Sequence, residues 1–479
     1  MDEYVKSIES QVIPLNVIDT QGSFSNIPFV FFYENVDAAD EFMPSVLLQN
    51  SFFRTMQEFP VFAGRVKSKG IGNVSIVVDA NNINMPDYVE DNSSVHFDSL
   101  KAAKYQWSSW PEGVATAGPM TRANSDGDIK LINVHVVRLL RNSGVMIYLS
   151  IPHYVLDGEA HMEVMRRWCT VYQLMATNQF DAINELPAYT FDRNVLHQNL
   201  PDERKPVDET TYRTFTEYSY LSEWFAWISP EWRGYILSKI VAWQQAEAHL
   251  FHVSNASVES LRAALREHAH GIDSISVNEL LLSLATKTLA QSQMQSEGRS
   301  FDGGVASSGD GKLPVAVIFE TRKHLGIERQ DYIGNVLIPK IVIQPLDELE
   351  APTTAESLAR TMSTFKDTVQ NLDAPLIGSH IDMVTSRPSC FTRPITRFSR
   401  SKTAMSFVYD IMPDMYKADF GNGRPEWVSP IQPFRANAVL LLTGRDPTDG
   451  VDVFMTAYPR VMKEILKNEF WTSFAKIIY

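Results

Sequence analysis

The chain has 479 residues, of which 44% are hydrophobic and 21% are charged, and its formal net charge is −14. This length and composition fit an ordinary globular protein with room for two domains. The acidic balance argues against nucleic acid or an anionic membrane as a generic partner.

Cysteine content and terminal sequence point to a reducing compartment. The two cysteines, Cys169 and Cys390, are too few for a disulfide framework and lack metal-ligand spacing. The acidic start, Met1-Asp2-Glu3, is not followed by an apolar run, so no signal peptide is expected. No stretch reaches the roughly 18 apolar residues of a membrane span. We therefore expect a cytoplasmic monomer with no membrane span.

Hydrophobic periodicity predicts mixed structure in the first half of the chain. A helix is expected over Pro44–Phe59 and a strand over Val74–Val78. Two further strands, Ile129–Leu140 and Val145–Ile151, are separated by turn residues. A helical pattern follows Gly158, whereas residues 92–118, rich in Ser, Trp and Pro, are expected to form loops.

The second half repeats the mixture of strands and helices. Ser276-Val277-Asn278-Glu279 has the form of a capping box and predicts the start of a helix. The other expected elements are a strand at Phe251–Val253, a helix at Ser254–His268, strands at Val315–Thr321, Ala438–Leu442 and Val451–Tyr458, and a helix at Pro459–Phe474. Each half therefore combines sheet and helix, and the fold class is α/β (α+β).

One histidine stands where a strand is predicted to give way to a helix. His153 directly follows the strand over Val145–Ile151, and Asp157 and Gly158 follow at the start of the helix. Histidine is the side chain best suited to accept a proton near neutral pH. Taken alone, the pattern also fits a buried strand-end histidine followed by a polar turn, so the rest of the chain must decide.

Five further motifs occur in a fixed order. They are Phe59-Pro60-Val61-Phe62-Ala63-Gly64-Arg65-Val66, Thr190-Phe191-Asp192-Arg193, Phe319-Glu320-Thr321-Arg322, Asp331-Tyr332-Ile333-Gly334-Asn335 and Asp419-Phe420-Gly421-Asn422-Gly423. With His-x-x-x-Asp-Gly, they resemble the BAHD family of acyl-CoA-dependent acyltransferases over most of the chain. Asn422 departs from the Trp of the family's Asp-Phe-Gly-Trp-Gly signature. Such departures from plant-type motifs suggest a fungal or other microbial member.

The resemblance implies an architecture. It predicts two chloramphenicol-acetyltransferase-like domains, each a mixed sheet with helices, that meet around a central channel. The first domain would span residues 1–200 and carry the His-x-x-x-Asp motif, and residues 201–235 would form the crossover linker. The second would span 236–479, with a segment at about 375–400 crossing back to the first domain.

The resemblance also implies roles for single residues. His153 would be the general base, whereas Asp157 would turn away from it, beside Gly158, and pair with Arg322. Asp419, Phe420, Gly421 and Gly423 would form a structural loop away from the reacting atoms. Candidate oxyanion or substrate contacts are Ser406, Tyr409, Tyr332 and Asn335. The remaining histidines form no metal-ligand set, so no metal is expected.

These roles predict transfer of an acyl group, acetyl or longer, from acyl-CoA to a hydroxyl or amine of a small-molecule acceptor in secondary metabolism. Acyl-CoA would be a co-substrate, and no permanently bound cofactor is expected. One alternative is a condensation-type domain acting on carrier-bound thioesters, although Pro152 stands where that family has a second histidine. Another is a non-catalytic binding protein that retains the fold. The sequence alone leaves the acyl donor and the acceptor undecided.

Overall fold

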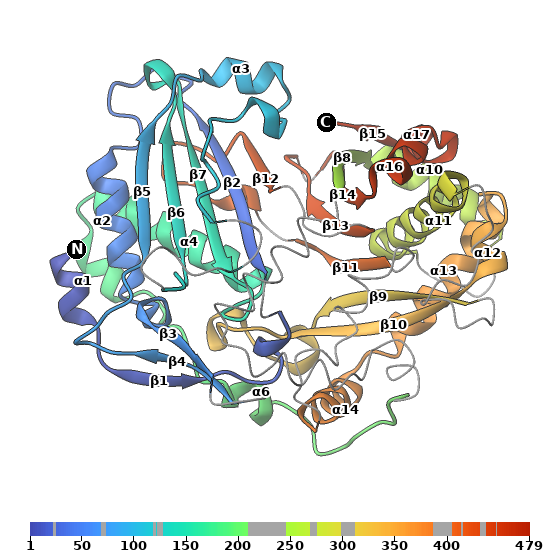
Figure 1. Ribbon diagram of the computed structural model, residues 1–479, viewed down its shortest axis with the longest axis horizontal. Coiled ribbons are helices and arrows are strands. Elements are labelled where there is room, and N and C mark those ends of the chain that lie inside the picture. The colour runs from blue at the N-terminus through green and yellow to red at the C-terminus, as the bar shows by residue number, and fades with distance from the viewer. Residues whose placement is uncertain are drawn as a thin grey trace.

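Two β-sheets, one in each half of the chain, form the frame of the protein (Figure 1). The computed structural model describes residues 1–22, 25–68, 73–117, 121, 128–208, 246–268, 275–297, 312–386, 405–412, 415–431, 437–446 and 448–479. Each sheet is packed against helices and has its own hydrophobic core. The structure therefore has the two-domain α/β architecture that the sequence predicts.

The first sheet has the strand order β12-β2-β7-β6-β5. Its strands are β12 (Trp427–Pro430), β2 (Asn26–Glu34), β7 (Gly144–Pro152), β6 (Asn133–Arg138) and β5 (Asp87–Asn92). Only β5 and β6 are parallel. Every residue of β7 is buried, as expected of a central strand made largely of Val, Ile, Leu and Met.

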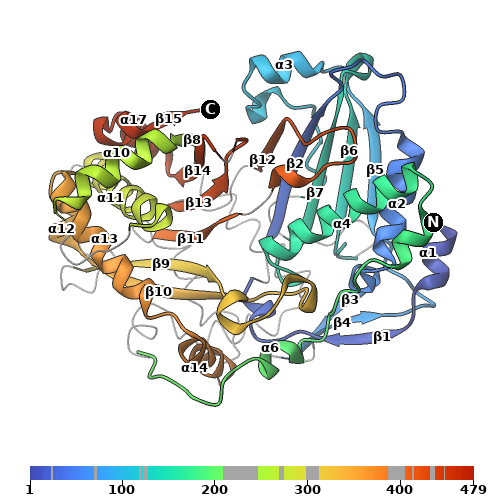
Figure 2. The same cartoon turned by 180° about the vertical axis from the view of Figure 1, so that it is seen from behind.

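Two long helices, α2 (Ser45–Met56) and α4 (Gly158–Ala176), lie side by side against one face of this sheet (Figure 2). The smaller elements of this half are a three-stranded sheet of β1 (Gln11–Pro14), β4 (Val74–Val78) and β3 (Arg65–Ser68), and helices α1 (Asp2–Ser7), α3 (Phe97–Ala102), α5 (Phe180–Asn184) and α6 (Asn194–Gln198). Helix α3 lies within the stretch predicted to be loop, because Phe97 and Leu100 bury their side chains there.

The second sheet has the strand order β10-β9-β11-β13-β14-β8-β15. Its strands are β10 (Leu337–Pro345), β9 (Lys312–Glu320), β11 (Met405–Met412), β13 (Ala438–Thr443), β14 (Gly450–Ala457), β8 (Glu247–Ser254) and β15 (Ala475–Ile477). Strand β11 runs parallel to both neighbours, and the other pairs are antiparallel.

The helices of the second half are α10 (Asn255–Arg266), α11 (Val277–Glu297), α12 (Leu346–Glu350), α13 (Ala355–Gln370), α14 (Ala374–Thr385), α16 (Pro459–Ile465) and α17 (Glu469–Phe474). The predicted capping box is present: Ser276 Oγ accepts from Glu279 N, and Glu279 Oε2 accepts from Ser276 N. The single helix predicted over Pro459–Phe474 is wrong. The segment forms two helices, α16 and α17, because Asn468 caps the second one by accepting from Trp471 N at 2.9 Å.

A segment of the second half crosses back to the first. Strand β12 pairs antiparallel with β2, and Phe420 joins the first hydrophobic core. The crossing was predicted at about 375–400 instead. Residues 375–385 belong to α14, whose Ile377 and Ile381 pack in the second core, and 387–400 lie outside the described residues.

Only the start of the predicted linker at 201–235 is described, because residues 209–235 lie outside the described part of the chain. Within that start, Arg204 and Lys205 form ion pairs with Asp382 and Asp373 of α14 and its cap. Arg204 and Lys205 are therefore tied to the second half of the chain.

Candidate active site

His153 directly follows the last residue of β7. Its backbone N–H donates to the carbonyl of Ser25 at 2.8 Å, which extends the β2–β7 ladder by one position. The chain turns after this residue, and α4 begins at Gly158. His153 is partly exposed, whereas every residue of β7 is buried. The histidine thus emerges from the core at the strand-to-helix turn that the sequence predicts.

The partner of this turn comes from the other half of the chain. Strands β9 and β10 form an antiparallel hairpin that extends from the second sheet toward the first half (Figure 1). The connection between them, residues 321–336, carries Arg322, Tyr332 and Asn335. The Asp157–Arg322 contact at this junction thus joins residues that are 165 positions apart in the chain.

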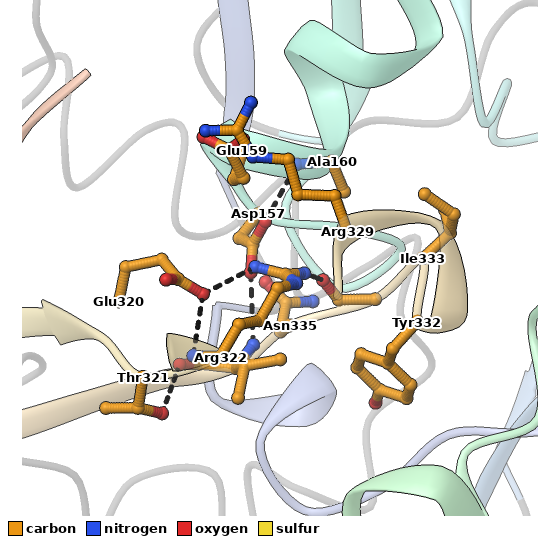
Figure 3. A network of polar contacts seen from close by, with 12 residues as sticks. Asp157, Glu159, Ala160, Glu320, Thr321, Arg322, Arg329, Tyr332, Ile333 and Asn335 are labelled. Carbon is orange, nitrogen blue, oxygen red and sulfur yellow. Dashed lines mark hydrogen bonds and ion pairs between the residues drawn. The ribbon is translucent and has the colours of Figure 1, made fainter. Parts of the chain in front are cut away.

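Asp157 and Arg322 form the predicted ion pair across this junction. Arg322 Nη1 lies 2.8 Å from Asp157 Oδ2, and both side chains are almost fully buried (Figure 3). Asp157 Oδ1 caps α4 by accepting from Ala160 N at 3.0 Å, and Oδ2 also accepts from Val336 N at 3.0 Å. Through these contacts the carboxylate links the turn, the helix and the hairpin loop.

Two glutamates extend this network. Glu320 Oε1 accepts from Arg322 Nη1 at 2.7 Å, and Glu159 pairs with Arg329 from the second half (Figure 3). Burial raises the pKa of both glutamates, while the neighbouring arginines oppose that rise. Asp157 and Glu159, on either side of Gly158, thus each form an ion pair with an arginine of the second half.

Asn335 contacts the imidazole of His153. Its Oδ1 lies 3.0 Å from His153 Nδ1, and its Nδ2 donates to Asp19 Oδ1 at 3.1 Å. Asp19 also accepts from the Asn335 backbone N–H at 3.1 Å. Asp19 is fully buried and belongs to the segment that leads into β2. A chain of contacts therefore runs from the imidazole through an amide to a buried carboxylate.

Arg193 also belongs to this network. Its Nε lies 2.8 Å from Asp19 Oδ2, and its Nη2 donates to the Val155 carbonyl at 2.9 Å. Its Nη1 donates to the Ile333 carbonyl, so one guanidinium holds the turn after His153 and the loop that carries Asn335. Gly334 makes room for this group, because a Cβ there would lie 2.5 Å from Arg193 Nη1.

Tyr332 is part of this buried network as well. Its ring lies 5.3 Å from the guanidinium carbon of Arg193, and its hydroxyl accepts from Asn16 Nδ2 at 2.6 Å. We call Asp157, Arg322, Asp19, Arg193 and Asn335 the charged junction. The predicted role of Tyr332 and Asn335 as oxyanion or substrate contacts stays a prediction.

A second histidine lies close to the first. His161, on the first turns of α4, is fully buried, and its ring contacts the ring of Phe29. Burial, together with the charge of His153, lowers the pKa of His161 to about 3. At neutral pH His161 is therefore an uncharged core residue behind the base.

The Asp419–Gly423 loop lies elsewhere. The Asp419 carbonyl accepts from Gln173 Nε2 at 2.5 Å, near the C-terminal end of α4. Gln173 lies 15 residues beyond Gly158, or about 22 Å along a helix that rises 1.5 Å per residue. This loop therefore lies far from His153, and its departure from the family signature, Asn422, is exposed.

The loop is held by its own aspartate and one aromatic side chain. Asp419 Oδ1 accepts from Gly421 N at 2.6 Å and Gly423 N at 3.0 Å, and both glycines have positive φ. Phe420 is buried among Tyr33, Trp168 and Tyr172, with ring centroids 5.1 to 5.6 Å away. The structural role implied for Asp419, Phe420, Gly421 and Gly423 stays a prediction.

Some predicted site features fall outside the description. Ser406 and Tyr409 belong to β11, but their side chains lie outside the described part of the structure. Among the described residues, no group of three or more His, Cys, Asp or Glu side chains is placed to hold a metal ion. Within the same ranges, no helix is long and apolar enough to cross a membrane.

Sequence reasoning missed two members of the charged junction. Arg193 belongs to a recognised motif, but the motif gave it no partner. Asp19 belongs to no motif, and its one local signal is a reciprocal turn in which Asn16 Oδ1 accepts from Asp19 N and Asp19 Oδ2 accepts from Asn16 N. That turn accounts for the local shape of the loop, but it does not indicate that Asp19 contacts the second half of the chain.

Comparison with known proteins agrees with this geometry. The model of the Transferase family matches residues 5–222 and 308–470. The chain belongs to this family of BAHD acyltransferases. It is accordingly an acyltransferase enzyme that transfers groups other than aminoacyl groups. No curated protein sequence matches the chain.

Solved structures share the fold at low identity. TRI101 of F. sporotrichioides, complexed with coenzyme A and T-2, has a TM-score of 0.73 and 15% identity, over 98% of this chain and 100% of that chain. Vinorine synthase has a TM-score of 0.64 and 15% identity, over 97% and 94%. The first condensation domain of the calcium-dependent antibiotic synthetase has a TM-score of 0.55 and 14% identity, over 97% and 96%.

Proposed function

We propose that this acyltransferase moves an acyl group from acyl-CoA to a hydroxyl or amine of a small-molecule acceptor, with His153 as general base. The observation that carries the proposal is the contact between His153 Nδ1 and Asn335 Oδ1 at 3.0 Å. A ring nitrogen that faces a carbonyl oxygen carries the proton, so the neutral imidazole keeps its lone pair on Nε2. That lone pair is what a general base needs.

The reaction then proceeds in two balanced steps. In the first step, the oxygen or nitrogen of the acceptor bonds to the carbonyl carbon of the thioester, and His153 Nε2 takes the proton from that acceptor atom. The tetrahedral oxyanion collapses, the carbon–sulfur bond breaks, and the proton on Nε2 passes to the departing CoA sulfur. The products are the acylated acceptor and free CoA, and His153 returns to its starting state.

Direct attack is favoured over a covalent acyl-enzyme, which needs a nucleophile beside a base. Ser150 and Cys169 are the hydroxyl and thiol near His153 in sequence, and both are buried. Burial raises the pKa of the Cys169 thiol well above its usual value, so the thiolate is disfavoured. Cys169 also lies 11 residues beyond Gly158, about 16 Å along α4.

The first substrates to test follow from the relatives. TRI101 of F. sporotrichioides was solved with coenzyme A and T-2, and TRI101 of F. graminearum with coenzyme A and deoxynivalenol. These complexes support a CoA thioester as donor and a small molecule as acceptor for this chain. Acetyl-CoA and longer acyl-CoAs, with secondary metabolites that carry a hydroxyl or amine, are the first substrates to test. We further propose that it acts as a cytoplasmic monomer without a permanently bound cofactor.

An intact-mass screen of acceptors against a panel of acyl-CoAs tests the proposal. Acylated product together with released CoA is the expected result. Initial rates measured while both substrates are varied should give intersecting lines, as for a ternary complex. Parallel lines, with an acyl-sized mass gain on enzyme exposed to acyl-CoA alone, would show a covalent route instead.

The condensation-type alternative makes a different prediction. The shared fold with a condensation domain supports it only at the level of architecture. Such an enzyme would use a donor attached to a carrier protein and would leave free acyl-CoA unchanged. Parallel assays with free and carrier-bound thioesters of the same acyl group separate the two functions.

A further inference from the structure

The buried residues behind His153 decide which end of the Asn335 amide faces the imidazole. An amide can offer either its oxygen or its NH2 group at such a contact. Asp19 Oδ1 lies 3.1 Å from Asn335 Nδ2, and a carboxylate only accepts hydrogen bonds. The NH2 end must therefore face Asp19, which leaves the oxygen to face His153 Nδ1.

We propose that Asp19 is a positioning residue for the base: by orienting the Asn335 amide, it selects the His153 tautomer that can take a proton from the acceptor. This inference rests on the proposed function of His153. If the amide were reversed, its NH2 group would face Nδ1 and donate to it. The imidazole proton would then lie on Nε2, which could no longer act as a base.

The polar contacts of Asp19 support the charged form that this role requires, against the opposing effect of burial. Burial raises the pKa of the carboxyl, but Arg193 and three N–H donors of Asn335 and Asn16 oppose that rise. The two oxygens of Asp19 accept from three N–H groups and face the Arg193 guanidinium. A carboxylate held in this way cannot rotate to release Asn335 without losing its own partners.

The arrangement also depends on both halves of the chain. Asp19, His153 and Arg193 come from the first half, and Asn335 comes from the β9–β10 connection of the second. Arg193 contacts carbonyl groups on both sides, Val155 and Ile333, so it fixes the distance between base and amide. The base acquires its working tautomer only where the two halves meet.

Nuclear magnetic resonance of enzyme with ¹⁵N-labelled histidine tests this directly. The His153 signals are identified by their loss in His153→Gln. In the wild-type enzyme near pH 8, the long-range proton–nitrogen pattern should show the proton on Nδ1. In Asp19→Asn, whose amide can offer either end to Asn335, the pattern should shift toward Nε2 protonation.

Kinetics give a second reading. Asp19→Asn should lower kcat about 10- to 100-fold. The loss is roughly 10⁴-fold when an aspartate in direct contact with a catalytic histidine becomes an asparagine. A smaller loss is expected here because Asn335 lies between Asp19 and His153. The KM for acyl-CoA should change less than about twofold, since Asp19 does not contact the donor in the proposed mechanism. A matched control is Asp452→Asn, which removes another buried carboxylate, paired with His252 at 2.7 Å. The control should leave the His153 tautomer unchanged.

Two results would overturn the inference: a wild-type His153 protonated on Nε2, or a folded Asp19→Asn enzyme with the wild-type tautomer and kcat. If Asp19→Asn does not fold, the wild-type tautomer and the variant Asn335→Ala decide the question. Asn335→Ala should then shift the proton toward Nε2. These spectra need no substrate, so they separate failure of this inference from failure of the proposed acyl transfer.

Discussion

The charged junction and the Asp419–Gly423 loop each contain an aspartate that accepts two or more hydrogen bonds, but they differ in what surrounds it. Asp157 faces an arginine from the other half of the chain and lies under the candidate base. Asp419 faces backbone N–H groups of its own loop, and its neighbour Phe420 fills an apolar pocket. The first arrangement joins two domains, and the second shapes one turn.

This difference explains why two equally recognisable motifs should respond differently to mutation. A buried charge that loses its partner is destabilising, and here it would also disturb the elements that position His153. A buried ring that is removed leaves a cavity, but the cavity would lie beside Trp168 and Tyr172, about 15 to 21 Å beyond Gly158 along α4. Damage to the junction should therefore affect catalysis and stability together, and damage to the loop should affect stability alone.

The largest effect is expected at the base itself. His153→Ala should lower kcat/KM about 10²- to 10⁴-fold, the usual contribution of a general base, without changing the fold. His197→Ala, which removes an exposed histidine of α6, is the control and should keep full activity. Steady-state assays with circular dichroism check this. Wild-type turnover in a folded His153→Ala enzyme would refute the mechanism.

Breaking the Asp157–Arg322 ion pair of the charged junction should lower both the stability of the protein and its catalytic rate. Arg322→Gln leaves the buried Asp157 carboxylate without its cation and should destabilise the protein by about 3–5 kcal/mol, with a lower kcat. Asp157→Asn should also lower stability and kcat but cost less, because Arg322 keeps Glu320 as an ion-pair partner. Asp382→Asn breaks an Arg–Asp pair whose aspartate side chain is 58% exposed, and should cost less than about 1 kcal/mol. Thermal unfolding and kinetics of all three variants test the pairing. An unchanged melting temperature in either junction variant would show that the pair does not stabilise the fold.

A mutation in the Asp419–Gly423 loop should lower the stability of the protein without lowering its catalytic rate. Phe420→Ala removes a fully packed ring and should destabilise the protein by about 3–5 kcal/mol. At a temperature where the variant is folded, its kcat should stay within about twofold of wild type. Asn422→Ala, at an exposed position, should change the free energy of unfolding by less than about 0.5 kcal/mol. A large loss of kcat in folded Phe420→Ala would place this loop in the catalytic machinery.

The buried histidine beside the base should make stability depend on pH. His161 has a pKa lowered to about 3, whereas an unfolded histidine titrates near 6.5. Between these values the unfolded state binds the extra proton, so the free energy of unfolding falls as the pH drops, by about 1.4 kcal/mol per pH unit. His161→Leu should remove most of this slope in urea titrations between pH 6 and 4. His197→Leu should not, and equal slopes in all three proteins would contradict burial of a neutral His161.

The smallest effect is expected at a glycine of the loop. Gly423 has φ +97°, and a Cβ there would meet no atom within 4 Å, so only backbone strain opposes substitution. Gly423→Ala should cost about 1–2 kcal/mol and leave kcat unchanged. Thermal unfolding measures the cost. Loss of activity without loss of stability would mean that the loop does more than shape a turn.

Local sequence determined much of this protein. The strand leading to His153, the helix after Gly158 and the capping box at Ser276 each follow from interactions within a few residues. Motif order also led to the family and to the Asp157–Arg322 pair. The loop around Phe420 was predictable because an aspartate and two glycines close it within five residues.

Tertiary structure decided the rest, because it depends on groups that are distant in the chain. Asp19 and Asn335 are 316 residues apart, and neither carries a local sign of the other. The crossing of β12 into the first sheet was not predicted, because a four-residue strand has too little periodicity to be assigned to a sheet. Sequence patterns specify which groups are available and in which local shape. The packing of one half against the other specifies which nitrogen of His153 carries the proton.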